Sequence, residues 1–222
     1  MNDAPFLGVL MLDTRFPRPP GDIGNPQTFA RAGVPVRFKT VHGASAKGVV
    51  QKADPSLYAP FLNAAKELVE QGAGLITTSC GFLAAYQSAF ETALSVPVIT
   101  SGLLLCEKLH RPGIVTFDHL ALGPSILGEA KVPPGTPISG LATGCHMQST
   151  ILNDLRVMNL ARAQADVIHA ALALIDANPE VENIVLECTN MPPYREAVRH
   201  ATGRTVHDIE TFLVQQWHAN YT

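Results

Sequence analysis

Cys80 and Cys188 occupy equivalent places in two similar stretches of the chain. Each cysteine ends a short apolar run and precedes a segment with helical character, and polar side chains flank it: Ser79 before Cys80, and Thr189 and Asn190 after Cys188. In open α/β sheets, ligands bind beyond the carboxyl ends of the strands, so we expect both thiols to reach one site. A helix N-terminus behind each cysteine would favour thiolate over thiol.

Two thiols on opposite sides of one small ligand suit proton transfer at a carbon atom. One thiolate would remove a proton from one face of that carbon, while the other thiol returned a proton to the opposite face. A proton next to a carboxylate is weakly acidic, so hydrogen-bond donors must stabilise the carbanion at the carboxylate oxygens. The predicted substrate-binding residues are Ser79, Gly81, Thr189, Asn190, Asn25, Asp13 and Thr116.

Two of these candidates have a competing structural interpretation. Asp13 closes a predicted strand, where capping of the next turn is the more common role of an acid. Asn25 precedes Pro26, and Asn before Pro is a common turn opener. Glu187 precedes Cys188, and strand alternation predicts that its side chain faces away from the thiol.

The elements that position these side chains follow a β–α rhythm. Short β-rich runs alternate with longer helical stretches, which is typical of a mostly parallel sheet covered by helices. The predicted strands are 6–12, 34–40, 74–80, 97–100, 113–117, 136–142, 183–188 and 205–208. The predicted helices are 55–71 and 160–177, with others after residues 80, 188 and 208.

An internal repeat divides the chain into two halves. A shift of 108 residues aligns Cys80 with Cys188 and Tyr86 with Tyr194, and a shift of 105 aligns residues 8–13 with 113–118. The order of elements agrees in both halves. We therefore predict two pseudo-symmetric α/β lobes, residues 1–100 and 101–207, each a mostly parallel four-stranded sheet flanked by helices. The active site would lie in the cleft between them, and the last helix, 208–222, could pack on either lobe.

A Pro- and Gly-rich segment, residues 15–26, follows the first strand. It is too long for a tight turn and has no apolar period, so it is either a surface excursion or an ordered functional loop. We expect a stiff lid over the cleft, because water must be excluded when a weakly acidic carbon is deprotonated.

Composition excludes several classes of protein. The 222 residues include 16 Lys and Arg against 19 Asp and Glu, a net charge of −3, and 16% are charged. This balance argues against a nucleic-acid-binding protein and a disordered chain. No apolar run reaches the roughly 18 residues of a membrane span, and the acidic start of residues 1–3 is unlike a signal peptide. We expect a cytoplasmic globular protein that binds neither nucleic acid nor membrane.

Four cysteines without a Cys-x-x-Cys pair indicate neither a disulfide scaffold nor a structural zinc site. Cys106 lies in an apolar Leu-rich stretch and is expected in the core. Cys145 adjoins His146, but no second ligand pair stands at a usable spacing for a metal.

Both cysteine segments resemble one known family. Ile-Val-Leu-Glu-Cys-Thr-Asn-Met-Pro-Pro-Tyr, 184–194, is similar to the second cysteine motif of the aspartate/glutamate/hydantoin racemase superfamily, and Leu-Ile-Thr-Thr-Ser-Cys-Gly-Phe, 75–82, to the first. The resemblance implies two α/β lobes with the active site between them, no metal or pyridoxal phosphate cofactor, and a homodimer. It assigns Cys80 and Cys188 as the catalytic thiols, and Ser79, Thr189 and Asn190 as carboxylate ligands.

The departures from the family motifs concern the substrate. Gly81-Phe82 follows the first cysteine where glutamate racemases have Asn-Thr, and Asn190 stands where they have His. The leading hypothesis is a cofactor-independent racemase or epimerase of a small carboxylate-bearing or hydantoin-like compound. One alternative is a cis-trans isomerase of an unsaturated diacid, in which a thiolate adds to the double bond. Another is a non-catalytic two-lobed protein that binds small anions at its helix N-termini.

Overall fold

The computed structural model describes residues 4–221; the acidic start at residues 1–3, on which the expectation about a signal peptide rests, lies outside them. The first lobe contains a parallel sheet with the strand order β2-β1-β3-β4. Its strands are β1 (Phe6–Leu12), β2 (Val36–Val41), β3 (Ala73–Thr78) and β4 (Val98–Ile99). β1 and β3 are buried almost throughout, as the continuous apolar runs of central parallel strands require.

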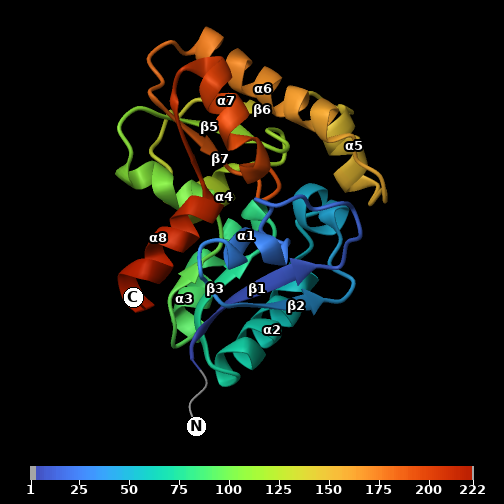
Figure 1. Ribbon diagram of the computed structural model, residues 1–222, viewed down its shortest axis with the longest axis vertical. Helices are drawn as coiled ribbons and strands as arrows, with labels where there is room; N and C mark the ends of the chain where they lie inside the picture. Colours follow the sequence, from blue (N-terminus) through green and yellow to red (C-terminus); the bar gives the residue numbers. More distant parts are fainter. Residues whose placement is uncertain (1–3, 222) are drawn as a thin grey trace.

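The second lobe repeats this arrangement. Its parallel sheet has the order β6-β5-β7-β8 and consists of β5 (Pro112–Thr116), β6 (Ile138–Gly140), β7 (Asn183–Leu186) and β8 (Thr205–Asp208). The order matches that of the first sheet when each strand is paired with the one four places later. Figure 1 shows the two sheets in the lower and upper halves of the molecule. The predicted pseudo-symmetric α/β fold is confirmed.

Helices flank both sheets (Figure 1). They are α1 (Pro26–Ala30), α2 (Tyr58–Glu70), α3 (Gln87–Ala93), α4 (Pro124–Glu129), α5 (His146–Leu152), α6 (Leu160–Ala177), α7 (Arg195–Thr202) and α8 (Ile209–Tyr221). The predicted helix at 160–177 has the observed bounds of α6, and the Asn159 side chain caps it by accepting from the N–H of Arg162. The predicted helix at 55–71 instead begins with a 3₁₀ turn, because Asp54 caps that turn ahead of Pro55.

Two glycines at equivalent positions let the long helices approach the central strands. A Cβ at Gly8 in β1 would crowd Leu68 of α2, and a Cβ at Gly113 in β5 would crowd Leu174 of α6. Both leucines are buried. The glycine that opens each half of the repeat is therefore explained by close packing between helix and strand.

The last helix joins the two lobes. α8 follows β8 of the second sheet, yet Trp217 and Leu213 pack in one cluster with Leu7 and Leu75 of the first sheet. The Tyr221 hydroxyl donates a 2.8 Å hydrogen bond to the main-chain oxygen of Gly74. A second apolar cluster contains residues from both sheets, so the lobes share a continuous core.

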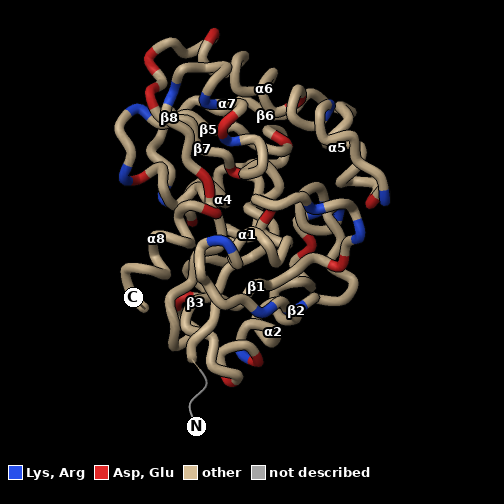
Figure 2. The backbone as a smooth tube through the Cα atoms, viewed as in Figure 1, with Lys and Arg blue, Asp and Glu red and all other residues tan. Residues whose placement is uncertain are grey.

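Lys, Arg, Asp and Glu are interspersed along the outside of both lobes (Figure 2). Within residues 4–221, no helix is long and apolar enough to cross a membrane.

Candidate active site

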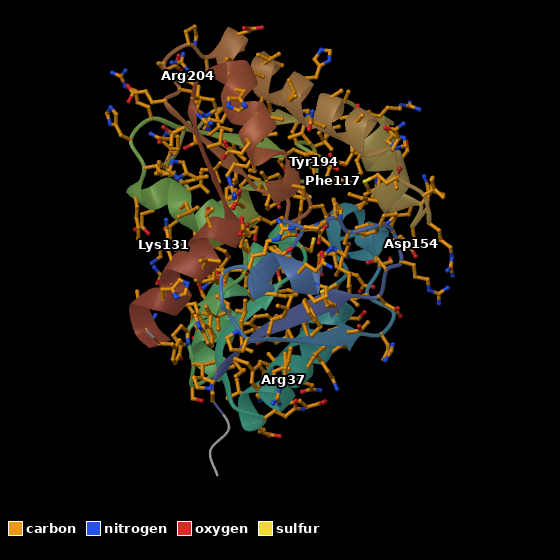
Figure 3. The ribbon with its side chains drawn as sticks, viewed as in Figure 1. Arg37, Phe117, Lys131, Asp154, Tyr194 and Arg204 are labelled. Carbon is orange, nitrogen blue, oxygen red and sulfur yellow. The ribbon has the colours of Figure 1, made fainter. Side chains whose placement is uncertain are left out.

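A small cavity lies between the lobes, where the carboxyl ends of β3 and β7 meet. Its volume is about 20 Å³, room for one water molecule. The apolar side chains around it belong to Leu12, Phe16, Ala46, Val50, Phe82, Phe117 and Ile151. The remaining lining residues are Ser79, Cys80, Gly81, Glu187, Cys188, Thr189 and Asn190. Figure 3 labels Phe117 in the region where the lobes meet.

Each cysteine lies two residues beyond its strand, since β3 ends at Thr78 and β7 at Leu186. The predicted strands ended at the cysteines themselves. The Thr78 hydroxyl explains the earlier end of β3, because it donates to the main-chain oxygens of Cys80 and Thr100 and accepts from the N–H of Cys80. These local bonds turn the chain out of the strand.

The Cys80 thiol is buried at the start of a 3₁₀ helix, residues 81–86. Burial, reinforced by the nearby Glu187, raises the pKa of this thiol to about 12. The N–H groups of Phe82 and Leu83, in the first turn of the helix, act in the opposite direction. Desolvation therefore outweighs the helix N-terminus, and the resting group is a thiol rather than the expected thiolate.

The Cys188 thiol is also buried, 2 residues from Asn190, to whose Oδ1 it donates at 3.5 Å. Burial raises the pKa of Cys188 well above its usual value, and Glu187, Cys80 and Asp22 all act in the same direction. The nearest helix is a short 3₁₀ turn at 192–194, and it begins four residues after the cysteine. Burial therefore favours the protonated form of both thiols.

Glu187 also lines the cavity, although strand alternation predicted the opposite orientation. β7 ends one residue earlier, so alternation no longer applies at this position. The side chain is fully buried; its Oε2 accepts from the hydroxyl of Thr116 at 2.8 Å, and its Oε1 has no hydrogen-bond partner among the described residues. Burial raises the pKa of Glu187 to about 7, while the bonds from Thr116 and the N–H of Phe117 act to lower it.

The predicted carboxylate ligands beside the cysteines line the cavity but already have partners in the protein. Ser79 Oγ accepts from the N–H of Leu12 at 2.9 Å. Asn190 Nδ2 donates to Asp22 at 2.7 Å, and the Thr189 hydroxyl donates across the lobes to the main-chain oxygen of Ser79. These side chains therefore hold the cysteine loops in position.

Three predicted substrate-binding residues are absent from the cavity lining. Asn25 caps α1, where its Oδ1 accepts from the N–H of Gln27, and its Nδ2 donates to the main-chain oxygen of Arg18. Asp13 is half-exposed and accepts from the N–H of Gly43, so it caps a turn. Thr116 acts on the cavity through Glu187. Asn25 and Asp13 are held by local caps, which Asn and Asp side chains commonly form in turns.

Gly81 lines the cavity because a larger residue does not fit. A Cβ at this position would clash with Oε1 and with the main-chain oxygen of Glu187. The glycine next to one cysteine therefore makes room for the carboxylate next to the other.

The segment 15–26 lies against the cavity and is attached to both lobes. The Phe16 side chain lines the cavity, while the N–H groups of Arg15 and Phe16 donate to Asp154 Oδ1 at 2.6 and 3.0 Å. Figure 3 shows Asp154 beside this loop, at the end of the second lobe. Farther along, the N–H of Ile23 donates to the oxygen of Thr189. Opening the cavity requires this segment or the lobes to move.

Sequence comparison finds relatives named dimethylsulfoniopropionate lyases. The chain is 29% identical over 217 residues to a dimethylsulfoniopropionate lyase of Durusdinium sp. clade D, covering 91% of this chain and 70% of the relative. It is 28% identical over 257 residues to dimethylsulfoniopropionate lyase 7 of Emiliania huxleyi (strain CCMP1516), covering 99% of this chain and 72% of the relative. No protein-family model matches the chain.

Structure comparison finds racemases and a decarboxylase. Allantoin racemase from Pseudomonas fluorescens matches with a TM-score of 0.63 and 16% identity over 96% of this chain and 90% of its own. Glutamate racemase from Bacillus anthracis matches with a TM-score of 0.60 and 16% identity over 97% and 82%. Unliganded arylmalonate decarboxylase matches with a TM-score of 0.55 and 17% identity over 91% and 86%. The chain has the fold of the aspartate/glutamate/hydantoin racemase superfamily.

Within this racemase-superfamily fold, sequence reasoning missed two features of the cavity. The first is Glu187, whose side chain is fully buried. A charged residue within an apolar run of the sequence, next to Cys188, is the signal that could have drawn attention to it. The second is the aromatic lining by Phe16, Phe82 and Phe117. Phe16 lies in the Pro- and Gly-rich segment 15–26 and Phe82 in the first cysteine motif, but no spacing rule relates these positions to Phe117.

Proposed function

We propose that this protein is a cofactor-independent lyase that cleaves dimethylsulfoniopropionate or a closely similar sulfonium carboxylate. The reaction begins as a racemase reaction does, with removal of a proton from the carbon next to a carboxylate. It differs in the next step, because a leaving group on the neighbouring carbon departs. The names of the relatives suggest the substrate, and the fold shared with racemases suggests proton transfer at a carbon atom.

One observation supports this choice over an ordinary amino-acid substrate. Among the lining residues in the described part of the chain, none is Lys, Arg or His, whereas three are phenylalanines and one is the buried Glu187. Aromatic faces and an acidic group stabilise methylated cations such as a sulfonium. A cation bound here would also lower the pKa of the two thiols, which burial and the nearby Glu187 raise.

The proposed step uses one thiolate as base. It takes the proton from carbon 2, and the electrons of that C–H bond form the carbon–carbon double bond. The bond between carbon 3 and sulfur breaks with its electron pair on sulfur, which leaves as neutral dimethyl sulfide. Acrylate and a protonated thiol remain, and the thiol returns its proton to solvent. The main-chain N–H groups near Cys80 and Cys188 are available to the substrate carboxylate once the thiols move toward the ligand.

The presence of two thiols in the cavity supports a second candidate function. Elimination needs one base, whereas racemisation needs an acid and a base on opposite faces of the carbon, and Cys80 and Cys188 line the cavity from opposite lobes. A racemase acting on a small carboxylate that lacks a leaving group is therefore the alternative function. Solvent deuterium distinguishes the two, because racemisation introduces deuterium at carbon 2 of recovered substrate.

The experiment is direct. The purified protein is incubated with dimethylsulfoniopropionate, dimethyl sulfide is measured in the headspace by gas chromatography, and acrylate is measured in solution by proton NMR. We expect the two products in equal amounts. The same NMR experiment in D₂O with chiral amino acids, hydantoins and diacids tests the racemase. Exchange without cleavage would favour the racemase, and neither reaction would contradict both.

A further inference from the structure

Glu187 is a buried carboxylic acid that the proton-transfer chemistry of the two thiols does not require. None of its surface is exposed, and Oε1 has no hydrogen-bond partner among the described residues. Leaving such an atom unpaired in the interior is destabilising when nothing compensates it. An unpaired acceptor at a ligand cavity is therefore a place where a ligand group belongs.

The surroundings of this carboxyl group indicate which ligand group that is. Oε2 is held by the hydroxyl of Thr116 at 2.8 Å and lies 3.4 Å from the N–H of Phe117, so the side chain has a defined orientation. The missing Cβ at Gly81 leaves the space that Oε1 occupies. The titratable groups that share the cavity with it are the thiols of Cys80 and Cys188, and both are uncharged when protonated.

When both thiols are protonated, Glu187 is the one described lining residue whose side chain can carry a negative charge, and no described lining side chain carries a positive charge. Outside the lining residues, the Arg18 guanidinium is paired with Asp22 at 2.9 Å and lies over the Phe16 ring, 4.3 Å from its centre. An ammonium group needs several hydrogen-bond acceptors, and the polar lining side chains of Ser79, Thr189 and Asn190 already have partners in the protein. A methylated onium group needs none and is stabilised by aromatic faces and a carboxylate.

We propose that Glu187 is a specificity-determining residue that selects ligands carrying a methylated onium cation over neutral ligands of the same shape. The proposal deepens the proposed function, on which it rests for the class of ligand. It assigns the carboxylate of Glu187 to the cationic end of the substrate, and it leaves proton removal to the thiols. Thr116 is then a positioning residue, because its hydroxyl donates to Oε2 and fixes the orientation of the carboxyl group.

Two ligands that have the same shape but differ in charge isolate the contribution of the positive charge to binding. 3-(Trimethylammonio)propionate carries a quaternary nitrogen where 4,4-dimethylpentanoate carries a carbon, and neither has a sulfonium leaving group. Binding of both is measured by isothermal titration calorimetry at pH 8 with the wild type and with Glu187→Gln. We expect the wild type to bind the cationic ligand about tenfold more tightly or better, and the variant to lose that preference.

A purely structural role for Glu187 predicts a different outcome. Glu187→Gln would then weaken both ligands equally, and that result would overturn the proposal. Equal binding of the two ligands by the wild type, or binding of neither, would overturn it as well. Thr116→Val gives an independent test if the glutamine variant fails to fold: the carboxylate stays but loses a bond that lowers its pKa. The preference for the cation should then appear only at a higher pH than in the wild type, and an unchanged pH profile would count against the proposal.

The result of this binding test can be separated from the result of the cleavage assay that tests the proposed function. Cleavage of dimethylsulfoniopropionate without any preference for the cationic isostere would remove this inference and leave the lyase standing. A preference for the cation in a protein that releases no dimethyl sulfide would remove the lyase and leave this inference standing.

Discussion

The side-chain hydroxyl of Thr189 donates a 2.7 Å hydrogen bond to the main-chain oxygen of Ser79. Thr189 follows one cysteine and Ser79 precedes the other, and the two residues belong to different lobes. Both are fully or almost fully buried. This bond therefore joins the two cysteine loops directly and sets how the thiols lie relative to each other.

Removing this bond should affect both stability and turnover. Thr189→Val keeps the shape of the side chain but takes the donor from a buried carbonyl oxygen, which costs about 1–3 kcal/mol of unfolding free energy. Small displacements of reacting groups lower rates steeply, so we expect kcat to fall about tenfold or more. Thr189→Ser keeps the hydroxyl and is the matched control; it should retain most of the unfolding free energy and most of kcat. Normal kcat in Thr189→Val would show that the lobes are held by other contacts.

Replacing Asn25 distinguishes a role in capping α1 from a role in catalysis. Its side chain caps α1 and donates to the main-chain oxygen of Arg18, so Asn25→Ala should lower the unfolding free energy by about 0.5–2 kcal/mol. Turnover per folded molecule should stay close to the wild-type value, because Asn25 is absent from the cavity lining. Urea denaturation and kcat measured on the same sample distinguish the two effects. A large fall in kcat at unchanged stability would restore the role as a substrate ligand.

The fold could be predicted because both halves of the chain carry the same signals. Continuous apolar runs marked the buried parallel strands, and the spacing of apolar residues over 160–177 defined α6. The glycines at 8 and 113 identified the start of each repeat, and close helix packing accounts for them. Strand ends were less predictable. A side-chain hydroxyl, that of Thr78, decides where β3 stops, and such a local bond leaves no periodic pattern.

The site was predictable to the level of the cysteine loops. Cys80, Cys188 and their neighbours meet because they follow equivalent strands, which the repeat implied. The orientation of the Glu187 side chain toward the cavity was not predictable, because alternation holds only within a strand and β7 ends at Leu186. For Asn25 and Asp13 the sequence left a local cap and a substrate contact both open, and the structure has the local caps. Phe16 comes from a loop whose path depends on Asp154, 138 residues away.

Asp154 controls how easily the cavity opens, because it accepts from the N–H groups of Arg15 and Phe16. Asp154→Asn keeps a residue type tolerated at its positive φ of 49° but removes the charge from both bonds. We expect Cys80 and Cys188 to be alkylated by iodoacetamide about fivefold faster than in the wild type, since alkylation follows the open population. Mass spectrometry of the two cysteine peptides measures the rates. Asp176→Asn, exposed on α6, is the control, and equal rates in both variants would contradict the anchoring role.

Glu187 should leave a signature in the pH dependence of stability. Burial raises its pKa from 4.5 to about 7, so the native state holds this proton more tightly than the unfolded chain does. Its contribution to stability is therefore complete below pH 4.5 and is lost as the pH rises to about 7. Glu187→Gln cannot titrate. The unfolding free energy of the wild type minus that of the variant should fall across this window and then level off. A flat difference would mean that the carboxyl group is solvated in the native protein.

The central claim is that a cysteine thiolate removes the proton from the carbon next to the carboxylate. It is tested most directly by the rate of dimethyl sulfide release from dimethylsulfoniopropionate carrying two deuterium atoms at carbon 2, compared with the unlabelled compound. The wild type, Cys80→Ser and Cys188→Ser are measured side by side, with Cys106→Ser as a control for a buried cysteine outside the cavity. We expect slower release from the deuterated compound and a fall of about 100-fold or more on replacing at least one of the two cavity cysteines. Equal rates for both compounds, with both cavity variants as active as the wild type, would contradict the account.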